Sequence, residues 1–471
     1  MSDKEKTVGQ RLQKELSVDW KNVYDTMSDE DLASLQGISR EYKNFLNIGR
    51  TERLCCAEME RQLKRAGFRE FNAYREPYEP GDKFYYKHRN KAIIAGIIGK
   101  SELSTGINII ASHIDSPRLD LKANPLYESD ELALLKTHYY GGIKKYQWTT
   151  IPLALCGVVI NRKGESIDVS IGLDMTDPVF CVTDLLIHLA TDQMMKKATE
   201  VVPGENLNIL FGSVPFKDDA ASEKVKLNIL SILHQKYDME EEDFVSAELE
   251  MVPAFPARDL GLDRSMIGAY GHDDRVCAFS SFKALLEAEE PVRTCLGVFV
   301  DKEEVGSMGN TGLESRLLVD FVHDLADMYS LPVRRVLAAS TCLSADVNAA
   351  YDPTYPEVSE KRNCARLGGG ITLTKYTGAR GKSGSSDASA ELMGKIRKLF
   401  NDNGIVWQTG ELGKVDQGGG GTVAQYVANL NVETVDCGVS MLSMHAPYEV
   451  VSKADVYMAY KAYRAFFEKF K

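Results

Sequence analysis

A short apolar run that ends in charged residues constrains the fold of this chain more than any other feature. The run from Cys295 to Val300 predicts a buried strand, and Asp301, Lys302, Glu303 and Glu304 follow it directly. In a parallel α/β sheet, ligands and chemistry gather just beyond the carboxyl ends of the strands. Burying two adjacent glutamates without compensation would cost on the order of several kcal/mol. Binding one glutamate to a cation, with its neighbour left free as a base, would stabilise the pair. A solvated acidic turn is the alternative interpretation.

Strands and helices alternate from Ser265 onward, which is typical of a parallel sheet. Ser452 with Asp455 predicts a capping box for the final helix. The apolar runs predict helices at Val276–Ala288, Leu313–Met328 and Ala388–Phe400, and strands at Val336–Leu343, Ile371–Thr374 and Val435–Leu442.

The chain has 471 residues, which is too long for one ordinary core, so we expect at least two domains. Between Leu119 and Pro256 the pattern changes to short predicted strands such as Leu153–Val159 and Ile167–Ile171. Side chains that could bind a metal are sparse there. This part of the sequence therefore predicts an inserted domain.

Composition excludes several classes of partner. The formal net charge is −12 and no block rich in lysine and arginine occurs, which argues against nucleic acid. No apolar run is long enough to span a bilayer, so no membrane association is expected. Nine cysteines are scattered through apolar segments, and an odd number suits a reducing compartment better than a disulfide framework. These features predict a cytoplasmic protein.

Five residues that follow an apolar run or a glycine are of types that bind divalent ions. Two imidazoles and three carboxylates suit zinc, and they are more ligands than one catalytic zinc usually takes. Two ions about 3.5–4 Å apart, bridged by one carboxylate, would use all five. Taken singly, each residue is more simply a hydrogen-bonded or capping side chain, so the prediction depends on the joint pattern. The five residues are His113, Asp274, Glu304, Asp346 and His445.

The motifs around these residues resemble, in order, those of the aspartyl aminopeptidase family of dinuclear zinc peptidases. They are Ser112–Arg118, Asp273–Arg275, Asp301–Ser307, Ser344–Asp346 and Met444–Ala446. The resemblance implies an α/β fold with a three-layer α/β/α catalytic domain, residues 1–118 and 263–471. It also implies that an inserted β-rich domain, residues 119–262, drives assembly into a large homo-oligomer, typically a dodecamer built from dimers.

The resemblance also implies how the metal ligands divide. His113 and Asp346 would hold one ion, Glu304 and His445 would hold the other, and Asp274 would bridge them. The family usually has Asp-Asn at the bridging position. Because an arginine takes the place of that asparagine here, Asp273 is a rival for the bridging role.

Four further residues receive roles by the same resemblance. Asp115 would fix the tautomer of His113, and Glu303 would be the general base. His188 would reach the active site of a neighbouring subunit and contact the substrate carbonyl; a histidine on an amphipathic helix is the alternative. Lys375 would face an acidic substrate side chain, although the family's downstream arginine is out of register here; a solvated lysine is the alternative.

We therefore expect an aminopeptidase that removes the amino-terminal residue, either acidic or of another class, from short peptides. Its cofactors would be two zinc ions per subunit, with cobalt and manganese as alternatives. A related dinuclear carboxypeptidase or deacylase is the alternative among enzymes. A catalytically inactive assembly protein of the same fold is the alternative from another class.

Overall fold

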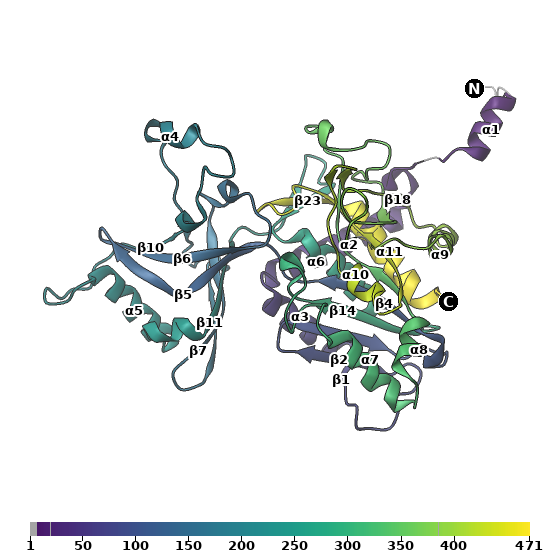
Figure 1. The fold of residues 1–471 in the computed structure, drawn as a ribbon, viewed down its shortest axis with the longest axis horizontal. Coiled ribbons are helices and arrows are strands. Elements are labelled where there is room, and N and C mark those ends of the chain that lie inside the picture. Colours follow the sequence, from purple (N-terminus) through teal and green to yellow (C-terminus); the bar gives the residue numbers. More distant parts are fainter. Residues whose placement is uncertain (1–6, 19, 385) are drawn as a thin grey trace.

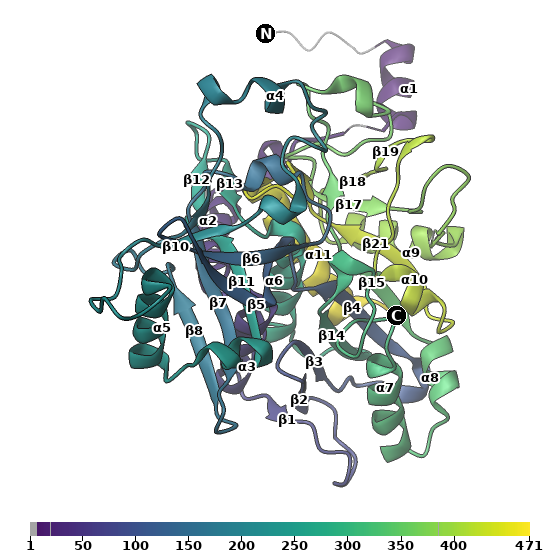
Figure 2. The same ribbon diagram turned by 60° about the vertical axis from the view of Figure 1, so that its left-hand side comes forward.

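The computed structural model describes residues 7–18, 20–384 and 386–471. Two large sheets organise it. In Figure 1 the seven-stranded sheet lies to the left with α5 (Lys224–Tyr237), and the nine-stranded sheet lies to the right among most of the other helices. The first helix, α1 (Val8–Leu16), extends away from both sheets and buries no side chain. Figure 2 shows the same two sheets from another side.

The nine-stranded sheet has a parallel centre. Strand β4 lies between β14 and β15 and runs parallel to both, and β21 continues the parallel arrangement beyond β15. The carboxyl ends of these four strands therefore meet at one edge. The strand order is β1 (Arg69–Glu70), β2 (Lys83–His88), β3 (Ala92–Ile97), β14 (Thr294–Val300), β4 (Ile107–His113), β15 (Thr341–Ser344), β21 (Glu433–Gly438), β17 (Ile371–Thr374) and β18 (Trp407–Thr409).

Helices cover both faces of this sheet, as alternating strand residues show. Ile93 and Ala95 belong to one buried cluster, whereas Ala92 and Ile94 belong to another on the opposite face. The sandwich is thus three-layered, which confirms the expected α/β fold class. One face carries α2 (Asp29–Ile48), α3 (Glu52–Arg65), α6 (His272–Leu286), α9 (Ala390–Asp402) and α11 (Lys453–Lys469); the other carries α7 (Leu317–Met328), α8 (Val333–Ala338) and α10 (Ala424–Ala428).

The seven-stranded sheet has its own buried cluster, which includes Trp148 and Leu249. Its strands all come from residues 118–253. Within the predicted 119–262 insertion, β12 (Arg258–Leu260) is the one strand outside this sheet; it pairs with β13 (Met266–Ala269). The sheet order is β8 (Ser166–Ile171), β7 (Leu153–Ile160), β11 (Ala247–Pro253), β5 (Arg118–Ser129), β6 (Leu132–Tyr140), β10 (Ile209–Gly212) and β9 (Cys181–Val182), and the short helix α4 (Thr191–Met194) lies in the β9–β10 connection.

A five-stranded sheet positions two further parts of the chain beside the edge of the nine-stranded sheet. Its strands β13 and β23 are antiparallel, with Ala269 opposite Glu449. Its order is β12, β13 (Met266–Ala269), β23 (Glu449–Ser452), β22 (Ser440–Leu442) and β16 (Asn348–Ala349), and a separate two-stranded sheet joins β19 (Gly413–Lys414) to β20 (Gln417–Gly418).

Two local predictions were wrong. The run Val336–Leu343 is not one strand, because α8 continues to Ala338 and the strand begins only at Thr341. A short apolar run cannot by itself distinguish a buried helix end from a strand. The predicted capping box is also absent: Ser452 accepts from the backbone of Ala454, while the Asp455 carboxylate accepts from Gly368 and Gly370.

Across residues 7–18, 20–384 and 386–471, no helix combines the length and the apolar character needed to cross a membrane. All nine cysteines are free, and eight of them are buried.

Candidate metal centre

Three predicted site residues lie at adjacent strand ends. His113 is the last residue of β4, and Glu304 follows β14 in a single helical turn, Glu303–Val305. Asp346 lies two residues beyond β15. Because β14 and β15 flank β4, the parallel register brings these side chains to the same edge.

Two more residues reach this edge from the five-stranded sheet. His445 lies in the turn between β22 and β23, and Asp273 lies between β13 and the regular part of α6. The ψ angle of Asp273 is 109°, which is extended and not helical, and the peptide bond between Asp273 and Asp274 is cis.

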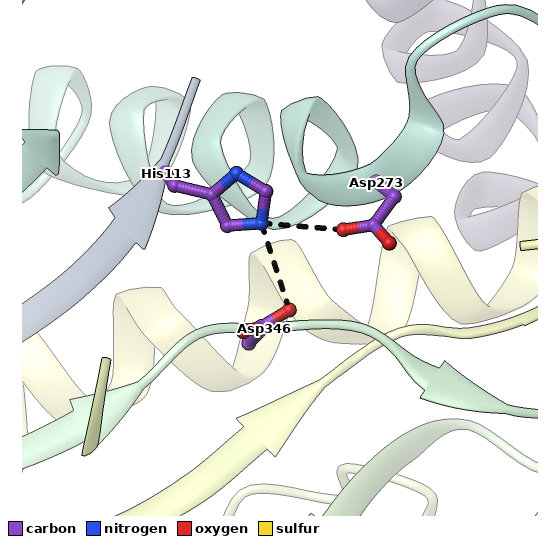
Figure 3. A group of neighbouring side chains, drawn as sticks. All are labelled: His113, Asp273 and Asp346. Carbon is purple, nitrogen blue, oxygen red and sulfur yellow. Dashed lines mark ion pairs between the residues drawn. The ribbon is translucent and has the colours of Figure 1, made fainter. Parts of the chain in front are cut away.

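One group of possible metal ligands consists of His113, Asp273 and Asp346 (Figure 3). The Nε2 atom of His113 lies 3.2 Å from an Asp273 oxygen and 3.9 Å from an Asp346 oxygen. The His113 side chain is 1% exposed. In Figure 3 both carboxylates point toward the same ring nitrogen.

A second group consists of Asp273, Glu304 and His445. The Nε2 atom of His445 lies 3.2 Å from the other Asp273 oxygen and 3.5 Å from a Glu304 oxygen. Asp273 therefore contributes one oxygen to each group and stands between the two histidines.

The geometry corrects the expectation for Asp274. The shared carboxylate is that of Asp273, because Asp274 belongs to neither group. The Asp274 carboxylate is fully buried, and burial raises the pKa of Asp274 well above its usual value. The other four predicted ligands, His113, Glu304, Asp346 and His445, all come together here.

Hydrogen bonds at the far ring nitrogens identify the tautomers of both histidines. The Nδ1 atom of His113 faces the backbone and carboxylate oxygens of Asp115, at 3.1 and 3.2 Å. The Nδ1 atom of His445 faces the Gly142 carbonyl at 3.0 Å. Because these oxygens only accept, each Nδ1 carries a proton, which leaves each Nε2 as the ring nitrogen that can bind a metal. Both Nε2 atoms face carboxylate oxygens, so a divalent cation between them would take the place of the protons on Nε2.

The electrostatics of the site favour added positive charge. Burial raises the pKa of Glu304 and of Asp346 well above their usual values. Burial opposes a charged His445, yet its contacts with Asp273 and Glu304 raise the pKa of His445 to about 10. Because all three pKa values are raised, the carboxylates of Glu304 and Asp346 and the imidazole of His445 would hold protons when no cation is bound. Buried imidazole and carboxylate ligands of this kind suit zinc.

The sequence of residues 45–467 matches the family described as Aminopeptidase I zinc metalloprotease (M18). The chain belongs to this family. A Clostridium acetobutylicum relative named probable M18 family aminopeptidase 1 is 50% identical over 459 residues, which are 96% of this chain and 99% of the relative. The predicted aspartyl aminopeptidase-type family and the predicted enzyme class are thus confirmed: the chain is an aminopeptidase of a zinc metalloprotease family.

Solved structures agree with this M18 assignment. The crystal structure of an M18 aminopeptidase from Thermotoga maritima is 42% identical with a TM-score of 0.92, covering 96% of this chain and 100% of that one. The crystal structure of aminopeptidase I from C. acetobutylicum is 49% identical with a TM-score of 0.91, and it covers the same 96% of this chain and 100% of that one. A structure described as the S. cerevisiae mApe1 dodecamer shares the fold at 22% identity and a TM-score of 0.74, covering 92% and 97%.

A cavity of about 490 Å³ opens beside the metal centre of the aminopeptidase. Glu303 lines it with its side chain 18% exposed, and burial raises the pKa of Glu303 to about 7. Lys375, predicted to face the substrate, does not line this cavity; its ammonium binds Asp387 at 2.9 Å. Basic side chains that do line it are Arg380, Lys382 and Lys414.

His188 lies in a short exposed turn, Ile187–Leu189, and not in the cavity of its own chain. Its neighbours Leu186, Ile187 and Leu189 are 55%, 66% and 69% exposed.

Sequence reasoning missed three residues that support the aminopeptidase site. Glu449 is buried and accepts from the backbone N–H groups of His445 and Asp273, at 2.8 and 3.2 Å. Tyr140 and Gly142 contact the site from the seven-stranded sheet. Glu449 lies only four residues after His445, and a glycine pair follows Tyr140, but neither pattern identifies the contact.

Proposed function

We propose that this aminopeptidase hydrolyses the amino-terminal peptide bond of short peptides with two divalent ions, zinc above cobalt or manganese. His113 and Asp346 would hold one ion, Glu304 and His445 the other, and Asp273 would hold both. One observation carries this proposal: two histidines whose Nδ1 atoms are hydrogen-bonded both direct their Nε2 atoms at one shared carboxylate.

Bound divalent ions supply Lewis-acid chemistry and lower the pKa of water. Glu303 does the proton transfer: it takes a proton from the attacking water and passes it to the leaving amine. Two observations support this role. Glu303 lines the cavity within 3.7 Å of His113 Nε2, and burial raises its pKa to about 7, close to the pH at which a general base works best.

We also infer a preference for an acidic amino-terminal residue. Lys375 and Lys382 both bind Asp387, and Lys375 does not line the cavity. Lys375 is therefore a weaker candidate for binding the substrate's side chain than the basic residues that do line the cavity. Arg380 and Lys414 line the cavity and form no ion pair among the residues that the structure describes. Their charges favour a carboxylate at this position.

Assembly completes the proposal. His188 would reach a neighbouring subunit and contact the substrate carbonyl there, which fits its exposed apolar segment. A homo-oligomer built from dimers would enclose the sites and admit only short peptides; the yeast structure that shares this fold is described as a dodecamer. Nine free cysteines fit a reducing compartment such as the cytoplasm.

The test is a screen of aminoacyl substrates, acidic against neutral and basic, with zinc, cobalt and manganese supplied in turn. We expect acidic substrates to react fastest, a chelator to abolish turnover, and amino-acetylated peptides to resist cleavage. Equal cleavage of acetylated and free peptides would overturn the amino-end assignment, and chelator-insensitive turnover would overturn the metal assignment. Faster cleavage of neutral substrates would reject only the acidic preference.

A further inference from the structure

Three consecutive residues, at the end of β6 and in the bend that follows it, lie beside the metal centre. Tyr140 ends β6, and its hydroxyl donates to an Asp115 carboxylate oxygen at 2.7 Å. The other Asp115 oxygen lies 3.2 Å from His113 Nδ1. The Tyr140 hydroxyl is therefore linked through Asp115 to the His113 ring by two hydrogen bonds.

The two glycines after Tyr140 contact the other half of the site. The Gly142 carbonyl accepts from His445 Nδ1 at 3.0 Å. Gly141 has a φ of +77°, and a Cβ atom added there would lie 3.2 Å from a Glu304 carboxylate oxygen. A side chain at 141 would thus be strained and would press on Glu304.

The Tyr140 ring is itself fixed by charged neighbours. The Arg118 guanidinium lies 3.9 Å from the ring centroid, and the Lys302 ammonium lies 5.3 Å away. Arg118 is buried and lies opposite Tyr140 in the β5–β6 pairing. With 7% of its surface exposed, Tyr140 has little freedom to leave Asp115.

We propose that Tyr140, Gly141 and Gly142 form a positioning segment through which the seven-stranded sheet orients both histidine rings and so sets the affinity for zinc. This inference rests on the proposed function, since it requires the two histidines to bind metal. Hydrogen bonds to the second ring nitrogen fix the tautomer and raise ligand basicity, and losing such a partner typically weakens metal binding about 10–100-fold.

A purely structural role for Tyr140 makes a different prediction. The packing of residue 140 against Arg118 depends on the aromatic ring, and a phenylalanine would keep that ring in place. Orientation of Asp115 depends on the hydroxyl. Tyr140→Phe therefore separates the two roles, and Tyr139→Phe is a matched control because the neighbouring Tyr139 is 41% exposed and makes no contact with Asp115.

The experiment measures zinc affinity of the full-length chain by competition with a chromophoric chelator, together with the rate at which zinc-loaded protein loses its metal. We expect Tyr140→Phe to bind zinc up to about 10-fold more weakly, the lower end of the effect of losing a direct partner, because its hydroxyl acts through Asp115; circular dichroism and assembly should be unchanged. Tyr139→Phe should match the wild type. Gly141→Ala, a second variant, should also release zinc faster because its Cβ presses on Glu304.

The outcomes separate this inference from the proposed function. If Tyr140→Phe and Gly141→Ala both hold zinc like the wild type while His113→Ala loses it, the positioning segment is refuted and the metal assignment stands. If the wild type binds no zinc, the proposed function fails and the inference falls with it. If Tyr139→Phe weakens binding as much as Tyr140→Phe, the effect is general to the sheet and the specific role is rejected.

Discussion

The metal-binding edge of the nine-stranded sheet and the His188 turn of the seven-stranded sheet contrast in burial and in completeness. At the edge, His113, Glu304 and Asp273 are almost fully buried, and their polar atoms converge within one chain. In the turn, Ile187 and Leu189 are more than half exposed. One chain therefore contains every proposed metal ligand, whereas the proposed role of His188 requires a second chain.

The largest expected effect tests whether Glu303 acts at the edge as a base and not as a ligand. Glu303→Gln keeps the shape and removes the proton acceptor. We expect kcat to fall about 10³–10⁴-fold while zinc content stays unchanged, because Glu303 belongs to neither ligand group. Metal analysis and steady-state kinetics on the same preparation measure both. An active variant would remove Glu303 from the mechanism.

The next effect distinguishes the two neighbouring aspartates. Asp273→Ala removes an oxygen from both ligand groups, so zinc affinity should fall by more than the roughly 100-fold upper value for an indirect partner. Asp274→Asn should keep both ions, because Asp274 lies in neither group. Competition with a chelator measures both variants. Retention of zinc by Asp273→Ala together with its loss from Asp274→Asn would restore the original assignment.

The contrast between these aspartates shows how far the sequence could lead. The strand-end pattern predicted His113, Glu304 and Asp346 correctly as neighbours, because parallel strands bring their carboxyl ends together. It could not choose between Asp273 and Asp274. That choice becomes visible only in the folded backbone, where both aspartates leave the helical conformation and only Asp273 belongs to the two ligand groups.

Contacts between distant segments were beyond the sequence as well. Tyr140 and Asp115 are separated by 25 residues, and His445 and Gly142 by 303. Periodicity reports burial along one element, so it places neither partner opposite the other. Lys375 shows the same limit: its position after β17 was foreseen, but its pairing with Asp387 was not.

A third prediction tests the proposed role of the exposed His188 turn. His188→Ala should keep the oligomer and lower kcat about 100-fold, the effect of losing one donor to the substrate carbonyl. The double variant Ile187→Asp/Leu189→Asp should dissociate the oligomer, and its kcat should fall as much as that of His188→Ala. Leu262→Asp is the control, because Leu262 is fully exposed in a different segment. Sedimentation velocity and kinetics measure these effects.

A mixing experiment decides whether His188 acts in a second chain. Co-expressed His188→Ala and Glu303→Gln chains should form hybrids that regain activity, because each intact Glu303 then meets an intact His188 from its neighbour. Inactive hybrids that still assemble would confine His188 to its own chain, and the contrast between the two regions would disappear.

The smallest expected effect concerns the joint between the two parts of the chain that carry these regions, the α/β/α sandwich and the seven-stranded sheet. We call the contacts of Arg118 with Glu52 and Glu250 the joint. Arg118 of β5 lies 3.6 Å from Glu52 on α3 and 3.2 Å from Glu250 on β11. Burial raises the pKa of Glu250 well above its usual value, so native Glu250 loses its proton only at a higher pH than an exposed glutamate does. Burial also opposes a charged Glu52, but Arg118 and Lys91 outweigh it and lower the pKa of Glu52 to about 2.

The sign of the pH dependence follows from these shifts. The unfolded chain releases the Glu250 proton near pH 4.5 and the native chain does so only at higher pH, so this residue's contribution to stability falls as pH rises above 4.5. Each unit of separation between the two pKa values is worth about 1.4 kcal/mol. Glu250→Gln mimics the protonated acid, so its thermal midpoint relative to wild type should be higher at pH 8 than at pH 5. Glu52→Gln should be less stable than wild type at both values, since it removes the charge that faces Arg118. A Glu250→Gln protein that loses more stability at pH 8 than at pH 5 would show that Glu250 is ionised in the joint, and that both regions meet there through two charged acids.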